Sequence, residues 1–296
     1  TDMDSLEIII KKNRAIINKC IKSYFSTLKE HSRLRTAMMY GVSNGGKRMR
    51  PFLVIELGKF LKIPKISYLN LATAIEFIHC YSLIHDDLPQ MDNDNFRRGR
   101  LTTHKKFDEA TAILAGSSLY CLAIEILSSK KTHPDSDIRS DLCRLISEYS
   151  GIKGLAQGQS FDIIFENKYA SKKQILNTYM LKTSKLFEIS LICPFIMKKS
   201  SKKTINNARV YGRNLGIIYQ IVDDLLDLDG DFKEIGKTSG KDRKSKKNTL
   251  VEKIGREASI QLCYELANEA TCRKKIFGSK HLPFKNLIYN LITRKI

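Results

Sequence analysis

Residues 205–228 read INNARVYGRNLGIIYQIVDDLLDL, and the spacing of their apolar side chains decides the fold class. The apolar residues recur at intervals of three and four, which places them on one face of an α-helix. They are Ala208, Tyr211, Leu215, Ile218, Val222 and Leu225. The same spacing predicts a helix over 68–86, whereas alternating strand patterns are almost absent. We therefore predict an all-α protein with about ten or more helices.

The chain shows no sign of being divided into separate domains. It has only six prolines, and neither a repeat nor a low-complexity linker is present. Short basic, polar segments at 198–204 and 237–248 are predicted to be loops. Because no shift in composition marks a boundary, we predict a single domain over 1–296.

The composition is that of a folded protein from a reducing compartment. A hydrophobic content of 42% over 296 residues is enough for a substantial core. The seven cysteines form no CxxC pair, which argues against a disulfide framework or a zinc site. We expect no apolar run to reach the ~18 residues that a membrane span needs. The N-terminal segment TDMDSLEIIIKKNR carries acidic residues before its short apolar patch, which is unlike a signal peptide. We expect a cytoplasmic protein without stable membrane insertion.

The net charge of +20 points to a polyanionic partner without identifying it. A strongly basic domain can bind nucleic acid through a concentrated basic patch. Here the lysines are scattered among Ile and Asn residues along the whole chain. Small polyanionic substrates would be attracted equally well by such a field.

A first acidic cluster lies in residues 85–100, HDDLPQMDNDNFRRGR. Four carboxylates, Asp86, Asp87, Asp92 and Asp94, precede three guanidinium groups, Arg97, Arg98 and Arg100. Either this is a solvated loop of mixed charge, or it binds a multivalent anion through metal ions. Six residues turn a helix face by about 120°, so Asp92 would not align with Asp86 on a straight helix. A distortion at Pro89 could bring the two together.

A second acidic cluster lies in YQIVDDLLDLDGD, residues 219–231. On a helix, Gln220, Asp223, Asp224 and Asp227 share one face, and Asp223 and Asp227 lie about 6 Å apart. Like charges at this spacing destabilise a helix unless a cation sits between them. Oxygen ligands alone favour a hard ion such as Mg²⁺. The alternative is a solvated acidic helix end, which the flanking large apolar residues disfavour.

Six segments carry a resemblance that runs from end to end of the chain. They are GGKRMRPFL at 45–53, IHCYSLIHDDLPQMDNDNFRRG at 78–99, GQSFD at 158–162, KTSKL at 182–186, YQIVDDLLD at 219–227 and GKTSGKD at 236–242. In this order they resemble the trans-prenyltransferases, or isoprenyl diphosphate synthases, of the short-chain bacterial type that makes farnesyl diphosphate. The resemblance implies the isoprenoid synthase fold, with helices around a central apolar cavity.

The resemblance also implies a reaction and partners. Members of the family join isopentenyl diphosphate head to tail to dimethylallyl and then geranyl diphosphate, releasing diphosphate by Mg²⁺-assisted ionisation. The expected product is (2E,6E)-farnesyl diphosphate. The expected cofactor is Mg²⁺, as three ions held by the two acidic clusters when substrate is bound. The partners implied are small-molecule diphosphates and a second copy of the chain in a homodimer, with no nucleic acid.

The resemblance assigns roles to residues of this sequence. The metal-binding set is Asp86, Asp87, Asp92, Asp223, Asp224 and Asp227, of which Asp87 and Asp224 are the weaker candidates for direct ligands. The allylic diphosphate set is Arg97, Lys182, Thr183, Gln220, Lys237 and Lys247. The isopentenyl diphosphate set is Lys47, Arg50, His79 and Arg98. The residues expected to act in catalysis are Asp86, Asp92, Arg97, Lys182, Asp223 and Lys237.

Product length is expected to depend on Tyr81 and Ser82, five and four residues before Asp86. An aromatic residue at the first position resembles the farnesyl makers, because the ring blocks further elongation. Tyr81 as an ordinary core aromatic is the alternative. The chain departs from the family pattern at Leu250 and Val251, where Tyr-Pro is usual. This departure bears on the closing of the loop at 237–249 and on the role of Lys247.

Three other functions remain as alternatives. A geranylgeranyl or geranyl diphosphate synthase is the nearest. A terpene cyclase would usually replace DDLLD with an Asn/Ser/Glu motif. A basic helical RNA-binding protein would leave two acidic clusters without a role.

Overall fold

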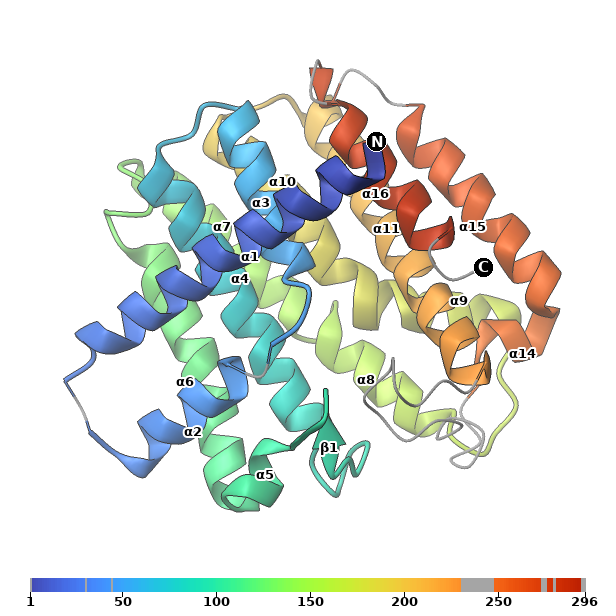
Figure 1. The fold of residues 1–296 in the computed structure, drawn as a ribbon, viewed down its shortest axis with the longest axis horizontal. Coiled ribbons are helices and arrows are strands. Elements are labelled where there is room, and N and C mark those ends of the chain that lie inside the picture. Colours follow the sequence, from blue (N-terminus) through green and yellow to red (C-terminus); the bar gives the residue numbers. More distant parts are fainter. Residues whose placement is uncertain are drawn as a thin grey trace. The chain divides into compact units, whose positions relative to one another are not determined.

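A computed structural model describes residues 2–29, 31–43, 45–229, 248–272, 276–278 and 281–293. Contacts group the chain into two compact units, one of residues 8–144 and one of residues 1–7 with 145–296. In the described ranges nearly all regular structure is helical, which confirms the all-α prediction (Figure 1). The prediction of a single domain over 1–296 stays a prediction.

The unit of residues 8–144 is a helical layer with one small hairpin. Its elements are α1 (Asp2–Thr27, whose first residues belong to the other unit), α2 (Arg33–Val42), α3 (Met49–Phe60), α4 (Lys65–Asp86), β1 (Phe96–Arg97), β2 (Arg100–Leu101), α5 (Thr103–Lys106), α6 (Glu109–Ser128) and the start of α7 (Ser136–Ser150). The helix predicted over 68–86 is α4. It packs against α3 and α6, and most of its sides are apolar and buried, as expected of a helix within a core.

The second unit is built around one long helix, α11 (Lys202–Asp229). Its other elements are α8 (Leu155–Ile164), α9 (Lys172–Tyr179), the π-helix η1 (Met180–Ser184), α10 (Lys185–Met197), α14 (Leu250–Ile254), α15 (Arg256–Thr271) and α16 (His281–Thr293). All six apolar residues that predicted this helix are buried. Helix α11 therefore has the amphipathic face that the sequence predicts, packed against α10, η1 and α15.

Two glycines bring α11 close to its neighbour in the chain. A Cβ added at Gly212 would lie 2.7 Å from Cα of Glu188, and one at Gly216 would overlap Cα of Ser184. Real Cβ atoms do not approach backbone atoms this closely. The glycines, one turn apart, therefore allow η1 and α10 to lie directly against α11.

The loop predicted at 198–204 is shorter than expected. Helix α11 begins at Lys202, because the Ser201 hydroxyl accepts a hydrogen bond from the Thr204 backbone N–H at 3.2 Å and caps its first turn. Of the loop predicted at 237–248, residues 237–247 lie outside the described residues.

One described helix, α6, is long and apolar enough to cross a membrane by length and composition. The expectation that no segment reaches this length was wrong, because only two charged residues, Glu109 and Glu125, occur within 109–128. A single helix of this kind is weak evidence for a membrane span, since a core helix passes the same test. In this unit α6 packs against α4 and α2.

Candidate active site

The first acidic cluster sits where α4 ends and the chain folds back on itself. The helix ends at Asp86, and the backbone N–H of Asp92 donates to the carbonyl oxygen of Asp86 at 2.8 Å. Likewise the N–H of Asp94 donates to the carbonyl oxygen of Asp87 at 3.1 Å. As predicted, a distortion around Pro89 returns Asp92 to the side of Asp86. The helix ends at this point in a series of turns and does not continue through Pro89 with a kink.

Asp87 does not behave like its neighbour Asp86. Its carboxylate is buried and accepts hydrogen bonds from Arg97, from Nε at 2.9 Å and from Nη2 at 2.6 Å. Burial by itself lowers the pKa of Arg97, but the hydrogen bonds and charge of Asp87 outweigh it and raise that pKa above its usual value. The two-point contact fixes the orientation of the guanidinium group.

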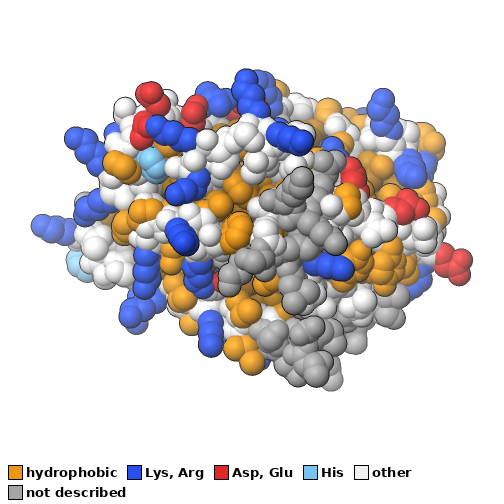
Figure 2. Space-filling view, turned by 90° about the horizontal axis from the view of Figure 1, so that it is seen from above, with side chains coloured by type: hydrophobic (Ala, Val, Ile, Leu, Met, Phe, Trp, Pro, Cys, Tyr) orange, Lys and Arg blue, Asp and Glu red, His pale blue; other side chains and the backbone are white. Residues whose placement is uncertain are grey.

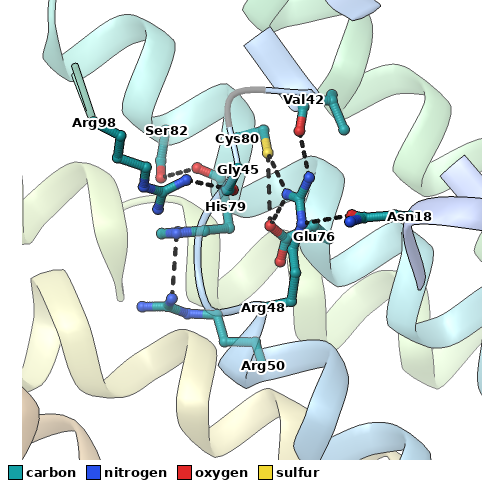
Figure 3. Close-up of polar contacts among 10 residues, drawn as sticks. All are labelled: Asn18, Val42, Gly45, Arg48, Arg50, Glu76, His79, Cys80, Ser82 and Arg98. Atoms are coloured by element: carbon teal, nitrogen blue, oxygen red, sulfur yellow. Dashed lines mark hydrogen bonds and ion pairs between the residues drawn. The ribbon is translucent and has the colours of Figure 1, made fainter. Parts of the chain in front are cut away.

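Arg98 reaches back from the hairpin to the glycine-rich loop. Strand β1 pairs antiparallel with β2, and φ is positive at both turn residues, Arg98 and Gly99, as tight two-residue hairpins require. Arg98 Nη1 donates to the carbonyl oxygen of Gly45 at 2.6 Å (Figure 3). A Cβ at Gly46 would collide with the same guanidinium group. The second glycine of the motif thus makes room for the Arg98 guanidinium group.

Arg50 and His79, two further residues expected to bind isopentenyl diphosphate, contact each other. Arg50 Nη1 lies 3.3 Å from His79 Nε2, and because arginine can only donate, Nε2 must accept (Figure 3). Part of the His79 surface is exposed, but dense surroundings desolvate the imidazole. Desolvation first, and then the charges of Arg50 and Arg98, hold the pKa of His79 well below its usual value. The ring is therefore neutral and carries its proton on Nδ1.

The second acidic cluster divides into two outward carboxylates and one inward carboxylate. Asp223 is exposed and Asp227 half-buried, whereas Asp224 is buried. Asp224 accepts hydrogen bonds from the Tyr179 hydroxyl and from Gln220 Nε2, the latter at 3.0 Å. Thr183 Oγ1 donates in turn to Gln220 Oε1 at 3.0 Å.

Tyr179 was not predicted to be part of the site. Besides donating to Asp224, its hydroxyl accepts a hydrogen bond from the Leu250 backbone N–H at 2.9 Å. Burial, followed by the Asp224 charge, raises the pKa of Tyr179 well above its usual value, so the hydroxyl keeps its proton and donates. No local pattern marked this tyrosine, because its two partners lie far from it in the sequence.

The KTSKL segment adopts an unusual backbone. Lys182 and Thr183 lie in η1. Single π-helical turns are rare in proteins overall, but many of those known lie at functional sites. Lys182 Nζ lies 2.8 Å from Asp162 Oδ2, the acid of the GQSFD segment. A Cβ at Gly158 would come within 2.6 Å of the Lys182 backbone nitrogen, so α8 lies against η1. Asp162 is a residue that sequence reasoning missed, although its segment was among those carrying the resemblance.

Tyr81 packs in an edge-to-face pair with a second tyrosine. Its ring centroid lies 5.4 Å from that of Tyr120 on α6, and 5.3 Å from the His85 ring. Ser82 uses its hydroxyl locally, donating to the carbonyl oxygen of His79 at 2.7 Å. Tyr120 was missed by the sequence analysis. The available signal was an aromatic residue within the small-residue stretch AGSSLYC at 115–121.

Two predicted residues, Lys237 and Lys247, lie outside the described residues. Within the described ranges, no three or more His, Cys, Asp or Glu side chains gather closely enough to hold a metal ion. Mg²⁺ is commonly bound by one or two carboxylates, with waters and substrate phosphates completing its shell. The pairs Asp86 with Asp92 and Asp223 with Asp227 fit this pattern.

Comparison with known proteins gives the family. The polyprenyl synthetase model matches residues 31–274. The chain belongs to the polyprenyl synthetase family. The farnesyl diphosphate synthase of Micrococcus luteus is 39% identical over 263 residues, covering 89% of this chain and 90% of that protein. The large subunit 1 of the heterodimeric chloroplastic geranylgeranyl pyrophosphate synthase of Arabidopsis thaliana is 36% identical, covering 94% of this chain and 75% of that protein.

Solved structures agree with the family assignment. The geranyltransferase of Helicobacter pylori complexed with magnesium and isoprenyl diphosphate is 32% identical. It superposes with a TM-score of 0.80, over 95% of this chain and 98% of that one. These likenesses confirm the predicted isoprenyl diphosphate synthase resemblance, the all-α fold of the family and the prenyltransferase class. The individual residue roles stay predictions.

Proposed function

We propose that this prenyltransferase condenses isopentenyl diphosphate with dimethylallyl diphosphate and then with geranyl diphosphate, giving (2E,6E)-farnesyl diphosphate. One observation carries the proposal. Arg98 contacts the loop that carries Lys47, and Arg50 contacts His79. The helix that bears His79 ends at Asp86, and Asp92 follows in the turns after it. An anion site made of side-chain cations thus adjoins a carboxylate site suited to a metal-bound anion.

The chemical problem is to ionise a carbon–oxygen bond of the allylic diphosphate. Mg²⁺, when bound, supplies Lewis-acid neutralisation of the departing diphosphate. Asp86 and Asp92 of the first cluster, and Asp223 and Asp227 of the second, would hold three such ions. The magnesium in the Helicobacter pylori complex supports this assignment. Asp87 and Asp224 are engaged by Arg97 and by Tyr179, which supports an orienting role for both.

The allylic diphosphate would be held by Arg97, Lys182, Thr183 and Gln220, together with Lys237 and Lys247. Asp87 orients Arg97, and Asp162 holds Lys182 at 2.8 Å. A guanidinium group that is already oriented loses less conformational freedom on binding phosphate. The side chains of Arg97 and Lys182 would therefore need little rearrangement to bind the diphosphate.

Isopentenyl diphosphate would bind to Lys47, Arg50, His79 and Arg98 without metal. Arginine presents a planar fork that matches two phosphate oxygens at once. The neutral His79 already accepts from Arg50, so its Nδ1–H group is the donor left for an anion. No side chain is assigned as the base for the final deprotonation. The departing diphosphate would take that proton.

We further propose a cytoplasmic homodimer. The outward face of α6 carries small and apolar side chains, among them Ile113, Leu114, Ser117 and Cys121. A two-fold interface places the same patch of both copies in contact, and small residues allow two helices to approach closely. Sedimentation of the purified protein checks this, and a mass of one chain would contradict it.

Two alternatives can be weighed against specific observations. Similarity to the Arabidopsis relative favours a geranylgeranyl product. The Tyr81–Tyr120 pair favours a shorter product. RNA binding would call for a continuous basic surface. Figure 2 shows Lys and Arg side chains dispersed over the visible face, interspersed with apolar and neutral ones.

The test is incubation with dimethylallyl and isopentenyl diphosphates plus Mg²⁺, followed by chromatography of the dephosphorylated products. We expect the fifteen-carbon alcohol, and no diphosphate release in EDTA. A twenty-carbon product would replace the farnesyl assignment by the geranylgeranyl one. Absence of turnover with every allylic starter, together with salt-sensitive RNA binding, would overturn the proposal.

A further inference from the structure

Arg48 stands between two cations of the GGKRMRP segment, Lys47 and Arg50, yet its side chain is turned into the protein. The side chains of Arg48 and of its partner Glu76 are each only 3% exposed. Figure 3 shows the guanidinium group surrounded by protein groups, next to the Arg50–His79 contact. Neither Arg48 nor Glu76 has a role in the function proposed above.

The Arg48 guanidinium joins three helices of its unit. Nη1 donates to Glu76 Oε1 on α4 at 2.5 Å, and Nη2 donates to the carbonyl oxygen of Val42, at the end of α2, at 2.6 Å. Nε donates to Asn18 Oδ1 on α1 at 3.2 Å. Sγ of Cys80, one turn after Glu76, lies 3.9 Å from Nη1.

The backbone of Arg48 is also unusual. It precedes the first residue of α3 and lies in the left-handed region, with φ 52 and ψ 43. Gly45 and Gly46, shortly before it in the loop, also have positive φ values. A residue with a long side chain keeps this conformation only where its surroundings impose it. The buried contacts of the guanidinium group are such surroundings, so they hold the 45–48 loop in one conformation.

The loop with the first turn of α3, and α4, carry residues proposed to bind isopentenyl diphosphate. Lys47 precedes Arg48 and Arg50 follows it, while His79 lies one helical turn after Glu76 on α4. The Arg48–Glu76 contact is therefore a buried link between the same two segments that the Arg50–His79 contact joins. We expect a change in that link to shift Lys47 and Arg50 relative to His79.

Stability alone does not account for a buried ion pair. Apolar residues of similar volume often stabilise a core as well or better, whereas removing one partner leaves an unpaired buried charge. We propose that Arg48 and Glu76 are a positioning pair, which sets Lys47 and Arg50 against His79 for the diphosphate of isopentenyl diphosphate. The proposal rests on the function proposed above.

The test compares Arg48→Met, Glu76→Leu, the double variant and a matched control. The control is Arg33→Met, which removes an exposed arginine–carboxylate contact of 2.8 Å, to Asp108, in the same unit. For each protein, Tm, kcat and the KM of both substrates are measured. The wild type is assayed first, and its failure to turn over any substrate pair would count against the proposed function and not against the pair.

We expect each single variant to lower Tm and the double variant to recover much of the loss. In the double variant, KM for isopentenyl diphosphate should stay raised by about tenfold to a hundredfold, because the cations are no longer held in place. KM for the allylic diphosphate should change less than about twofold, since Arg97 is oriented by Asp87. The Arg33→Met control should match the wild type in both KM values.

A double variant that folds and keeps the wild-type KM for isopentenyl diphosphate would overturn the proposal. So would an equal rise of both KM values, which indicates general loosening. If the double variant does not fold, Asn18→Ala removes one of the Arg48 hydrogen bonds without creating a buried charge. We then expect a rise in the KM of isopentenyl diphosphate alone, and an unchanged value would overturn the proposal.

Discussion

Adjacent aspartates of the two acidic clusters have different environments. Asp223 is exposed, while Asp224 accepts hydrogen bonds from Tyr179 and Gln220. In the first cluster, Asp87 is buried against Arg97, whereas Asp86 remains partly exposed. A carboxylate whose oxygens are already hydrogen-bonded and buried orients its neighbours, and an exposed one can take a metal ion. Burial thus predicts different roles for the two carboxylates of each DD pair.

This division predicts different results for substitutions on α11. Asp223→Asn should lower kcat/KM by a hundredfold or more, on the order expected when metal-assisted charge neutralisation is weakened. Steady-state assays at saturating Mg²⁺ measure the effect. Asp229→Asn is the control on the same helix, because Asp229 pairs with Arg256 at the surface. Equal losses in both variants would contradict the assignment of Asp223.

Tyr179→Phe should destabilise the protein. The substitution leaves the buried Asp224 carboxylate without one donor and the Leu250 N–H without its acceptor. An unsatisfied buried group of this kind reduces the free energy of unfolding by about 1–3 kcal/mol. Urea unfolding measures the change. Tyr169→Phe is the matched control, since Tyr169 is 80% exposed; a similar loss there would argue against the explanation.

His79 should make stability depend on pH. Its pKa in the folded protein lies well below the unfolded value of about 6.5, through burial and the neighbouring arginines. Below that pH the unfolded chain binds a proton that the folded chain excludes, so stability is fully present above about pH 7.5 and falls as the pH decreases. The contribution reaches about 1.4 kcal/mol per pH unit.

The check is the free energy of unfolding between pH 5 and pH 8 in wild type and His79→Gln. We expect the variant to show the smaller loss on acidification. His104 also has a lowered pKa, from burial first, but it is present in both proteins and cancels in the difference. Parallel curves for the two proteins would contradict a neutral, desolvated His79.

At the scale of elements, the contact between α4 and α6 determines where Tyr81 points. The rings of Tyr81 and Tyr120 pack edge to face. Tyr81 lies just over one helical turn before the first acidic cluster. The sequence predicted one tyrosine at this position. The second comes from a helix about forty residues away, and only the packing of α6 on α4 brings it there.

Removal of either ring should lengthen the product. We expect Tyr81→Ala and Tyr120→Ala to yield chains beyond fifteen carbons, because the apolar space that the ring fills becomes available to the growing chain. Gas chromatography of the dephosphorylated products measures chain length. Tyr81→Phe keeps the ring and serves as the control, with an unchanged product. Unchanged length in both alanine variants would remove the pair from the explanation.

Helix ends were less predictable than helix interiors. The interiors of α4 and α11 follow from apolar residues at intervals of three and four, a pattern that depends only on local geometry. The end of α4 depends on backbone hydrogen bonds such as Asp92 to Asp86, and η1 on its close packing against Gly158 and Gly216. The first is a local turn, which the pattern indicated as a distortion near Pro89. The second is a tertiary contact, so the pattern gave no sign of a π-helix.

For the whole molecule, the family model spans residues 31–274 and so includes most of both compact units. We therefore predict that the two units unfold together, as one domain. Calorimetry should give a single transition whose calorimetric and van't Hoff enthalpies agree. Two separated transitions would show that the units fold independently and would contradict the single-domain prediction. The same experiment with substrate diphosphates should shift the transition upward.

The sequence by itself determined the helical class, the course of α4 and α11, the family and the two acidic clusters. These depend on short-range spacing and on motifs that are read directly from the residues. Tertiary structure alone decided the partners of the charged groups: Arg48 with Glu76 across 28 residues, and Tyr179 with Asp224 across 45. The physical reason is that burial and pairing depend on which helices pack together. The spacing of residues along the sequence identifies the carboxylates, but it does not show which of them are exposed to solvent and which are buried.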